Sequence, residues 1–379
     1  MIKMLFILNI ANRVNSFSYT SMKAAQELEI DYHIAGNWNY ACDKERIDDE
    51  KKYGIHIYQI DFIRAPYHPG NIKAYKQLKK IVLREGFDVI HCNTPIGGVV
   101  GRLVGKSCKV PTIIYQAHGF HFYKGAPLLN WMVYYPIERW LARYTDALIT
   151  INQEDYERAR LFNLKNQGNV YYVPGVGIDI EQYHPKVFDR NAKRRELRIL
   201  TTDIMIISAG DLIKRKNYKI SIEAIAKTQN KRIHYFICGE GPEKGNLQKL
   251  ALKLGIEDQV HFLGFRKDIK ELLWTSDIFL FTTLQEGLPR SLSEAMAIGL
   301  PVVASRIRGN VDLICDGEGG FLIEPNDSEG YSQALKQIVE SSTIRNKMSQ
   351  VNLENIKKYD VRVVEQEIRN IYTEVLKQL

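Results

Sequence analysis

Several features are absent from this sequence of 379 residues, and each absence argues against a class of protein. The five cysteines are scattered and form no CxxC pair, so neither a disulfide framework nor a cysteine zinc site is indicated, and a reducing, cytoplasmic location fits best. No apolar run approaches the roughly 18 residues of a membrane-spanning helix. The stretch MLFILNIA (4–11) is followed by no small-residue cleavage site, and it predicts a first buried strand rather than a signal peptide.

The net charge of +8 is unevenly distributed. Residues 1–173 hold 22 Lys and Arg against 16 Asp and Glu, and between Arg64 and Lys109 nine basic residues accompany only two acidic ones. This excess indicates either a solvated helix face on 71–86 or an anion-facing surface for a membrane leaflet, a phosphorylated substrate or nucleic acid. A nucleic-acid or polyanion binder is disfavoured because aromatic residues are not interleaved with the basic segment as in the known modules.

Short apolar runs alternate with amphipathic segments along almost the whole chain, which predicts an α/β fold with parallel sheets covered on both faces. The alternation lapses once, over 175–203, a charged segment rich in turn formers that we interpret as a linker region. We therefore expect Rossmann-like domains at 1–174 and 204–360, facing one another across a cleft at the carboxyl ends of their strands. The final segment, 361–379, is predicted to be a helix that crosses back to the first domain.

One stretch, EGLPRSLSEAMAIGLPVVAS (286–305), predicts a helix between two strands. Pro289 suits the first helical turn, whereas Gly299 and Pro301 form a stop signal. Such a helix directs backbone amides at its mouth, where an anion such as a nucleotide diphosphate is favoured. Glu286 before the helix and Glu294 within it are placed to accept hydrogen bonds from sugar and ribose hydroxyls. By spacing alone they fit equally well as an ordinary loop acid and a solvated helix residue.

These residues resemble the E-x7-E signature, EGLPRSLSE, of the retaining GT-B glycosyltransferases of family 4. The resemblance extends over nearly the whole chain. In the second half it includes AGDLIKRKN (209–217) and the βαβ segment at 238–265. In the first half, ANRVNSF (11–17), TPIGGVVGRLVGK (94–106) and the segment 117–159 are similar to the branch that makes bacterial capsular and exopolysaccharide repeat units.

The resemblance implies a role for each matching residue. Glu286 would contact hydroxyls of the donor sugar, Glu294 the ribose, and Lys216 the diphosphate of the leaving nucleotide. His118 would contact the donor sugar near the reacting carbon. Backbone amides would hold the sugar and phosphates at Gly287, Leu288 and Arg290, and the uridine pocket would form around Gly239, Gly241, Phe265 and Arg266.

The chain departs from the family pattern at three places. Asp211 stands where the family commonly has Arg, so the second diphosphate cation would come from Lys214 or Arg215, or be absent. The first loop, NIANRVNSF, has no glycine, and side chains such as those of Asn15 and Ser16 would serve as donors instead. PGVGID (174–179) replaces the usual Asn-Gly-Val-Asp type of turn. These departures concern the phosphate contacts rather than the class of reaction.

The reaction implied by the resemblance needs no metal ion and no cofactor beyond the UDP-sugar co-substrate. A helix N-terminus together with Lys216 can offset the diphosphate charge. His118 and His121 form HxxH without a third ligand candidate, so a zinc site is not predicted. Retention of configuration would follow from front-face attack through an oxocarbenium-like transition state, with the leaving diphosphate taking the acceptor's proton.

The expected function is transfer of a sugar, with N-acetylhexosamine as the candidate, from a UDP-sugar to a polyprenyl-diphosphate-linked saccharide on the cytoplasmic leaflet in capsule or exopolysaccharide synthesis. The aromatic and basic segment 120–144 would either seat against lipid or form a buried helix on the first sheet. The alternative enzyme is a UDP-sugar 2-epimerase of the same fold, which needs no acceptor, so product analysis without acceptor separates the two.

Overall fold

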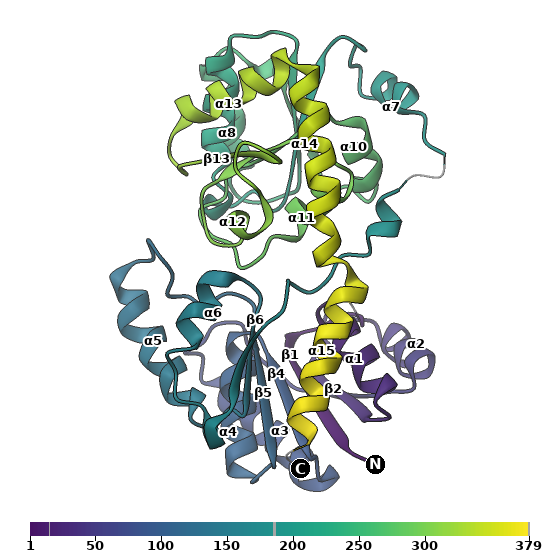
Figure 1. Cartoon of the computed structure of the whole chain (residues 1–379), viewed down its shortest axis with the longest axis vertical. Coiled ribbons are helices and arrows are strands. Elements are labelled where there is room, and N and C mark those ends of the chain that lie inside the picture. Colours follow the sequence, from purple (N-terminus) through teal and green to yellow (C-terminus); the bar gives the residue numbers. More distant parts are fainter. Residues whose placement is uncertain (15, 185–186, 378–379) are drawn as a thin grey trace. The chain divides into compact units, whose positions relative to one another are not determined.

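The computed structural model describes residues 1–14, 16–184 and 187–377, which form two compact units (Figure 1). The first unit comprises Met1–Gly177 and Val361–Leu379, and the second comprises Ile178–Asp360. Each unit contains one fully parallel sheet. The predicted α/β class with parallel sheets is confirmed.

The first unit has a seven-stranded sheet of order β3-β2-β1-β4-β5-β6-β7. Its central strands are buried on both faces, as expected for continuous apolar runs in a parallel sheet. The strands are β1 (Lys3–Ile10), β2 (Asp31–Asn37), β3 (His56–Gln59), β4 (Val89–Asn93), β5 (Thr112–Ala117), β6 (Ala147–Thr150) and β7 (Asn169–Tyr172).

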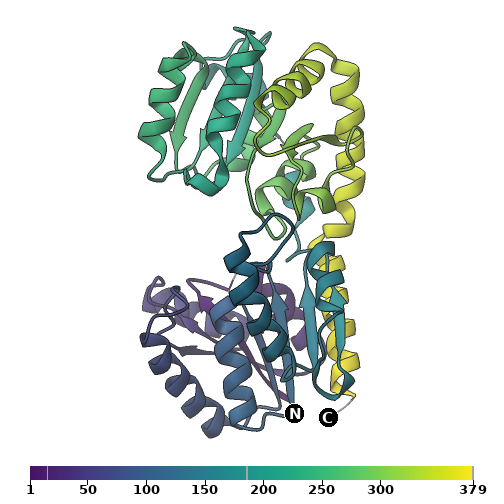
Figure 2. The ribbon, with the colours of Figure 1, turned by 90° about the vertical axis from the view of Figure 1, so that its left-hand side faces the viewer.

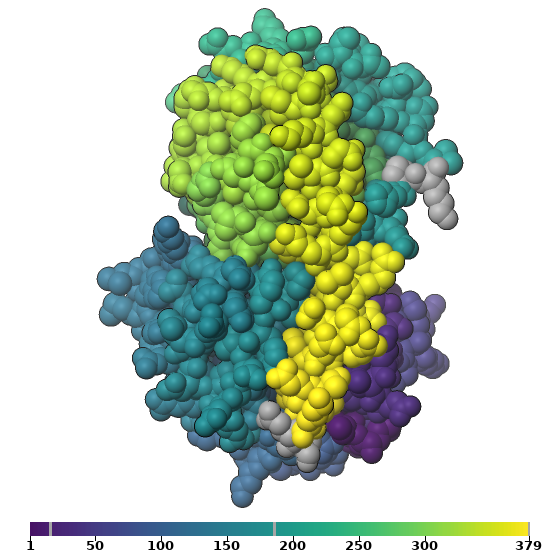
Figure 3. All heavy atoms as spheres, in the orientation of Figure 1, coloured from purple at the N-terminus to yellow at the C-terminus, as the bar shows by residue number. Residues whose placement is uncertain are grey.

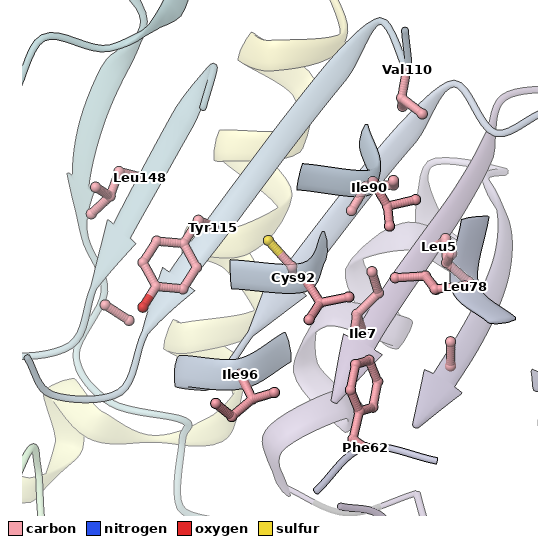
Figure 4. Packing of buried hydrophobic residues seen from close by; sticks show 14 of the residues in the cluster. Leu5, Ile7, Phe62, Leu78, Ile90, Cys92, Ile96, Val110, Tyr115 and Leu148 are labelled. Atoms are coloured by element: carbon pink, nitrogen blue, oxygen red, sulfur yellow. The ribbon is translucent and has the colours of Figure 1, made fainter. Parts of the chain in front are cut away.

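Helices cover both faces of this sheet, and Figure 4 shows the apolar core on the α3 and α4 side. There Ile7, Ile90 and Cys92 pack beneath α4. A Cβ at Gly101 of α4 would lie only 2.6 Å from the Cβ of Cys92, so this close approach of helix to sheet requires glycine. The helices between the strands are α1 (Ser16–Glu27), α2 (Asp43–Tyr53), α3 (Gly70–Glu85), α4 (Pro95–Ser107), α5 (Leu128–Ala142) and α6 (Gln153–Ala159), with a short 3₁₀ turn, η1 (Lys165–Gln167), before β7.

The C-terminal helix α15 (Val361–Leu376) belongs to the first unit. It packs beside α1 on the other face of the sheet, and Figure 3 shows the yellow C-terminal segment lying along the purple N-terminal one. Val364, Ile368 and Tyr372 are buried in this core. The hydroxyl of Tyr372 lies 2.7 Å from Nδ1 of His91 on β4, so a buried hydrogen bond ties the end of the chain to the central strand.

The second unit has a six-stranded sheet of order β10-β9-β8-β11-β12-β13, with helices on both sides (Figure 2). One face carries α8, α9 and α13, and the other carries α10 and α11. The strands are β8 (Ile204–Ala209), β9 (Ile233–Cys238), β10 (Val260–Gly264), β11 (Ile278–Phe281), β12 (Val302–Ser305) and β13 (Gly320–Ile323). The helices are α7 (Arg190–Glu196), α8 (Tyr218–Thr228), α9 (Lys244–Lys253), α10 (Ile269–Thr275), α11 (Arg290–Ala297), α12 (Asn310–Leu313), α13 (Ser328–Glu340) and α14 (Ser342–Asn355), with 3₁₀ turns η2 (Ile180–Tyr183), η3 (Lys214–Lys216), η4 (Glu257–Gln259) and η5 (Ile356–Tyr359).

Most of the segment predicted as a linker, 175–203, is part of the second unit in the structure. The division between units falls after Gly177, and the rest of the segment belongs to the second unit, where it contributes η2 and α7. Tyr183 and Ile199 are buried in the core of that unit. The guanidinium of Arg194 is also buried, and its Nη2 donates to the carbonyls of Leu200 and Asp203. The few apolar residues in this charged segment are thus sufficient to attach it to the second unit.

Candidate active site

The predicted E-x7-E helix forms as α11, which follows β11 and the loop 282–289. Leu292, Ala295 and Met296 are fully buried on its inner face, so burial of an apolar stripe holds the helix against the sheet. Pro289 stands immediately before the helix, with φ −78° and ψ 120°, one position earlier than the first helical turn predicted for it. Its ring still fits, because the residue before a helix needs no intrahelical N–H bond.

Glu286, in the loop before α11, is the centre of a cluster of hydrogen bonds. Its Oε1 accepts from Nζ of Lys216 at 2.8 Å, from Nη1 of Arg215 at 2.8 Å and from Oγ1 of Thr283 at 2.9 Å. The side chains of Glu286 and Lys216 are only 13% and 12% exposed, respectively. The sequence predicted Glu286 and the two basic residues as site residues. It did not predict Thr283, whose only signal was its position three residues before Glu286. The structure therefore brings three predicted site residues, Glu286, Lys216 and Arg215, into direct contact.

Backbone contacts hold the loops that carry this cluster. Nε of Arg308 donates to the carbonyl of Glu286 at 3.1 Å, and the amide of Leu284 donates to the carbonyl of Arg215 at 2.8 Å. Gly309 has φ +82°, and a Cβ there would lie 2.3 Å from the carbonyl oxygen of Gly287. Only glycine permits this approach. The position of Gly287 thus depends on a segment about twenty residues further along the chain.

Glu294 lies on α11 and contacts two side chains. Its Oε1 accepts from Nε of Arg290 at 2.8 Å, the i,i+4 spacing of a helical ion pair. The Tyr183 hydroxyl from η2 is the second neighbour; burial and then the adjacent Glu294 carboxylate raise the pKa of Tyr183 well above its usual range. Tyr183 lies in the segment interpreted as a linker, more than a hundred residues before Glu294, and no local pattern indicated it.

The glycines predicted around the uridine pocket bring two loops together. A Cβ on Gly239 would lie 2.0 Å from the carbonyl oxygen of Gly210, and one on Gly241 would lie 2.4 Å from that of Leu212. The amide of Gly239 also donates to the carbonyl of Gly264 at 2.8 Å. The loops that follow β8 and β9 therefore meet beside the end of β10, at the carboxyl edge of the second sheet.

The remaining residues predicted to bind the donor lie outside the cluster around Glu286. Phe265 is 72% exposed after β10. Arg266 makes a two-pronged ion pair with Asp268, at 2.7 and 2.6 Å, and hydrogen bonding from Arg266 is the main cause that lowers the pKa of Asp268. Lys214 and Asp211 are exposed. Of the two basic residues considered as the second diphosphate cation, Arg215 is the one that contacts Glu286.

In the first unit, His118 directly follows β5. Its Nε2 lies 2.9 Å from Oδ1 of Asn93, and its ring meets the edge of Phe17 at a centroid distance of 5.1 Å. Burial lowers the pKa of His118 to about 4, so the ring is neutral at physiological pH. His121 packs against the ring of Tyr134. Asn15 lies outside the described residues, and Ser16 is the first residue of α1.

Two segments of the chain match known protein families. Residues 189–354 match the family described as "Glycosyl transferases group 1", and residues 10–152 match "Glycosyl transferase 4-like". The chain is 33% identical over 376 residues to the putative glycosyltransferase EpsD of Bacillus subtilis (strain 168), covering 98% of this chain and 96% of the relative. The chain belongs to the group 1 glycosyltransferases. The family assignment predicted from the E-x7-E signature is confirmed.

Two further similarities place this group 1 glycosyltransferase among known proteins. It is 28% identical over 301 residues to the UDP-Gal:alpha-D-GlcNAc-diphosphoundecaprenol alpha-1,3-galactosyltransferase of Escherichia coli, covering 76% of this chain and 78% of the relative. Its fold matches Anabaena HepE, whose crystal structure is a complex with UDP, with a TM-score of 0.79, 20% identity, and coverage of 98% of this chain and 100% of HepE. The predicted GT-B architecture of two parallel-sheet domains is thereby confirmed.

Metal chemistry was not expected for this glycosyltransferase. Among the residues that the structure describes, no three His, Cys, Asp or Glu side chains gather as ligands for a metal ion. Metal independence remains a prediction that depends on the charges of Lys216 and Arg215 and on the amides before α11. The individual roles assigned to site residues likewise remain predictions.

Proposed function

We propose that this glycosyltransferase moves a sugar from a UDP-sugar to a polyprenyl-diphosphate-linked saccharide, with retention of anomeric configuration and without a metal ion. The observation that carries the proposal is the convergence of Lys216, Arg215 and Thr283 on Glu286 beside the N-terminus of α11. The E. coli relative is named for a UDP-sugar donor and a diphosphoundecaprenol-linked acceptor, which supports this substrate class. Relatives named for colanic acid biosynthesis and lipopolysaccharide core biosynthesis support a role in exopolysaccharide or capsule synthesis.

The site can perform this reaction with its own residues. The α11 amides and the cations Lys216 and Arg215 compensate the negative charge of the diphosphate, which increases as the bond from the anomeric carbon to the diphosphate oxygen breaks. Glu286 and His118 contact the sugar, and Glu294 contacts the ribose. The acceptor hydroxyl forms the new bond to the anomeric carbon on the face that the diphosphate leaves, and its proton passes to a diphosphate oxygen.

Lys216 has two roles in this proposal, because it also neutralises Glu286. Both side chains are largely buried, and a buried charge is costly unless it is paired. Before the donor binds, Glu286 and Lys216 satisfy one another. A bound donor offers its sugar hydroxyls to the carboxylate and its phosphate oxygens to the ammonium group, so donor binding replaces part of the contact between these two residues.

The donor sugar we propose is an N-acetylhexosamine, and the protein works at the inner face of the cell membrane as a peripheral protein. A UDP-sugar 2-epimerase shares the fold, but the relatives described above are named as glycosyltransferases. A panel of nucleotide sugars measured by thermal shift tests the donor class. A donor at 100 times its Kd adds about 2.7 kcal/mol to the free energy of unfolding. We expect a UDP-sugar to shift the melting temperature most; stabilisation by a GDP- or ADP-sugar alone would contradict the proposal.

Membrane association is proposed from the surface of the first unit. No helix among the described residues is long and apolar enough to cross a bilayer. On α5, however, Leu128, Leu129, Met132 and Trp140 are 73, 68, 66 and 45% exposed, and their spacing places them largely along one side of the helix. The same helix buries Glu138, Leu141 and Ala142 toward the protein. The segment 120–144 thus combines the two alternatives, with a face against the sheet and an apolar face available to lipid.

The basic residues of α3 provide the electrostatic part of this docking. Changing Lys76, Lys79 and Lys80 to Glu is expected to abolish most cosedimentation with anionic liposomes at low salt, since each basic residue near such a surface contributes about 1 kcal/mol. Binding of the parent protein should also decrease as salt increases. The matched control changes three exposed lysines on α9 of the second unit, Lys244, Lys249 and Lys253, to Glu. Equal loss in both triple variants would show that net charge, rather than the α3 surface, determines binding.

A further inference from the structure

Asn93 and His118 form a buried pair at the carboxyl edge of the first sheet. Asn93 is the last residue of β4, and His118 follows the neighbouring strand β5. The Asn93 side chain is fully buried, and its Oδ1 lies 2.9 Å from Nε2 of His118. The reaction proposed above uses His118 and leaves Asn93 without a role.

The chemistry of this contact determines which nitrogen of His118 carries the proton. The Asn93 amide is placed with its oxygen toward the ring and with its Nδ2 buried and unpartnered among the described residues. An amide oxygen can only accept a hydrogen bond, so in this orientation Nε2 of the neutral ring is the N–H donor. Nδ1 is then a lone-pair acceptor. Among the described residues Nδ1 of His118 is buried and has no hydrogen-bond partner in the protein. A buried acceptor without a partner is rare unless a ligand or water satisfies it.

The backbone beside Asn93 is strained, which indicates that this geometry is imposed. Thr94 has φ +64° and ψ 160°, a region that is populated almost only by glycine and is unusual for a β-branched residue. Its carbonyl accepts from the amide of Gly98 at 2.7 Å, and its hydroxyl donates to the carbonyl of Asn93. Such strain is found mainly at functional sites, where the surrounding structure enforces it.

We propose that Asn93 is a positioning residue, which holds His118 in the Nε2–H tautomer so that Nδ1 accepts a hydrogen bond from a hydroxyl of the donor sugar. This inference rests on the proposed contact of His118 with the sugar and adds its direction: the ring accepts, and the sugar hydroxyl donates. A sugar that lacks this hydroxyl would leave Nδ1 unpaired, so the pair contributes to donor selection.

The test is Asn93→Asp, which keeps the shape of the side chain and adds a negative charge beside Nε2. The carboxylate favours the charged ring and raises the pKa of His118. Below that pKa, Nδ1 carries a proton and cannot accept. Among the described residues, His91 of β4 is the titratable group coupled to this ring; it is buried, and burial and then His118 lower its pKa to about 3. From α1, the uncharged Phe17 ring contacts His118.

We expect kcat/KM of Asn93→Asp to fall severalfold as the pH decreases from 8.5 to 5.5, whereas the parent, in which the pKa of His118 is about 4, loses little over this range. Long-range ¹H–¹⁵N spectra of the imidazole nitrogens, assigned with His118→Gln, should show the neutral Nε2–H tautomer in the parent. UDP affinity, which reports the second unit, should be unchanged, and a parental melting temperature confirms that the first unit of the variant is folded. An Nδ1–H tautomer in the parent, or an unshifted pH profile in Asn93→Asp, would overturn the inference.

Failure of the proposed function itself has a different signature. If His118→Gln turns over at the parental rate, His118 does not contact the sugar, and the positioning proposal fails with it whatever the spectra show. If His118→Gln is impaired but Asn93→Leu, which cannot fix the tautomer, has the parental kcat and KM, only the role of Asn93 is disproved.

Discussion

Glu286→Gln is expected to lower kcat by about 10²-fold or more, the scale observed when one preorganised electrostatic contact is removed. As the anomeric centre becomes cationic in the transition state, its electrostatic attraction to the carboxylate of Glu286 becomes stronger. The neutral amide of Gln cannot provide this attraction. The change conserves size and one acceptor oxygen. Its main effect should therefore be on turnover. The free energy of unfolding should decrease only by the contribution of the contacts from Glu286 to Lys216 and Arg215.

UDP affinity separates this role from a structural one. UDP has no sugar, and removing the carboxylate releases Lys216 for the diphosphate, so the Kd for UDP should stay constant or decrease. The exposed Glu257, on η4, provides a matched Glu→Gln control that should keep the parental kcat. Parental turnover in Glu286→Gln would place this residue outside the reaction, and a tenfold weaker UDP affinity would indicate a collapsed diphosphate site instead.

Glu294→Ala has the second large expected effect, on binding. The ribose is common to the UDP-sugar and to UDP, so both should bind more weakly by the same factor. Loss of a hydrogen bond to a charged group costs about 1.5–3 kcal/mol, which corresponds to roughly 10- to 150-fold in Kd. Isothermal titration calorimetry with UDP measures this directly.

A comparison with 2′-deoxy-UDP distinguishes a ribose contact from indirect damage, because Glu294 also contacts Arg290 and Tyr183. In the parent protein, loss of the hydroxyl should weaken binding substantially. In Glu294→Ala the two nucleotides should bind about equally, since the contact is already absent, and the two changes are then non-additive. If the effects of Glu294→Ala and of removing the 2′-hydroxyl add fully, Glu294 does not bind the 2′-hydroxyl. Unchanged UDP affinity in the folded variant would exclude a role of Glu294 at the ribose altogether.

The strands were predictable because parallel strands buried on both faces must be continuously apolar. The run MLFILNIA (4–11), predicted as a first buried strand, covers all of β1 except Lys3. The helix α2 was not predicted. Its sequence, DKERIDDEKKY, is almost entirely charged, so it has no apolar periodicity to detect. It is stabilised by an N-terminal capping box around Cys42 and by Gly54 in the left-handed conformation at its end. Its buried Asp49 also accepts hydrogen bonds from Arg13 and from the amide of Val14.

The segment 175–203 shows a limit of a different kind. Charge and turn formers indicated a linker, yet Tyr183 and Arg194 are buried in the second unit. Arg194 is accommodated because carbonyl oxygens of Leu200, Asp203 and Thr275 accept from its guanidinium. Composition shows that a segment is polar, but whether its polar groups find buried partners depends on residues far away in the sequence.

By itself, the sequence determined the alternating α/β pattern, the two sheets and the helix α11 with a glutamate at each end of its signature, because these depend on local propensity and on apolar periodicity. Only the tertiary structure decided which charges meet. Lys216 and Glu286 are seventy residues apart and share one hydrogen bond, and Asn93 pairs with His118. Hydrogen bonds act over about 3 Å, so their partners follow from how strands and loops assemble at one edge of a sheet, which no spacing along the chain records.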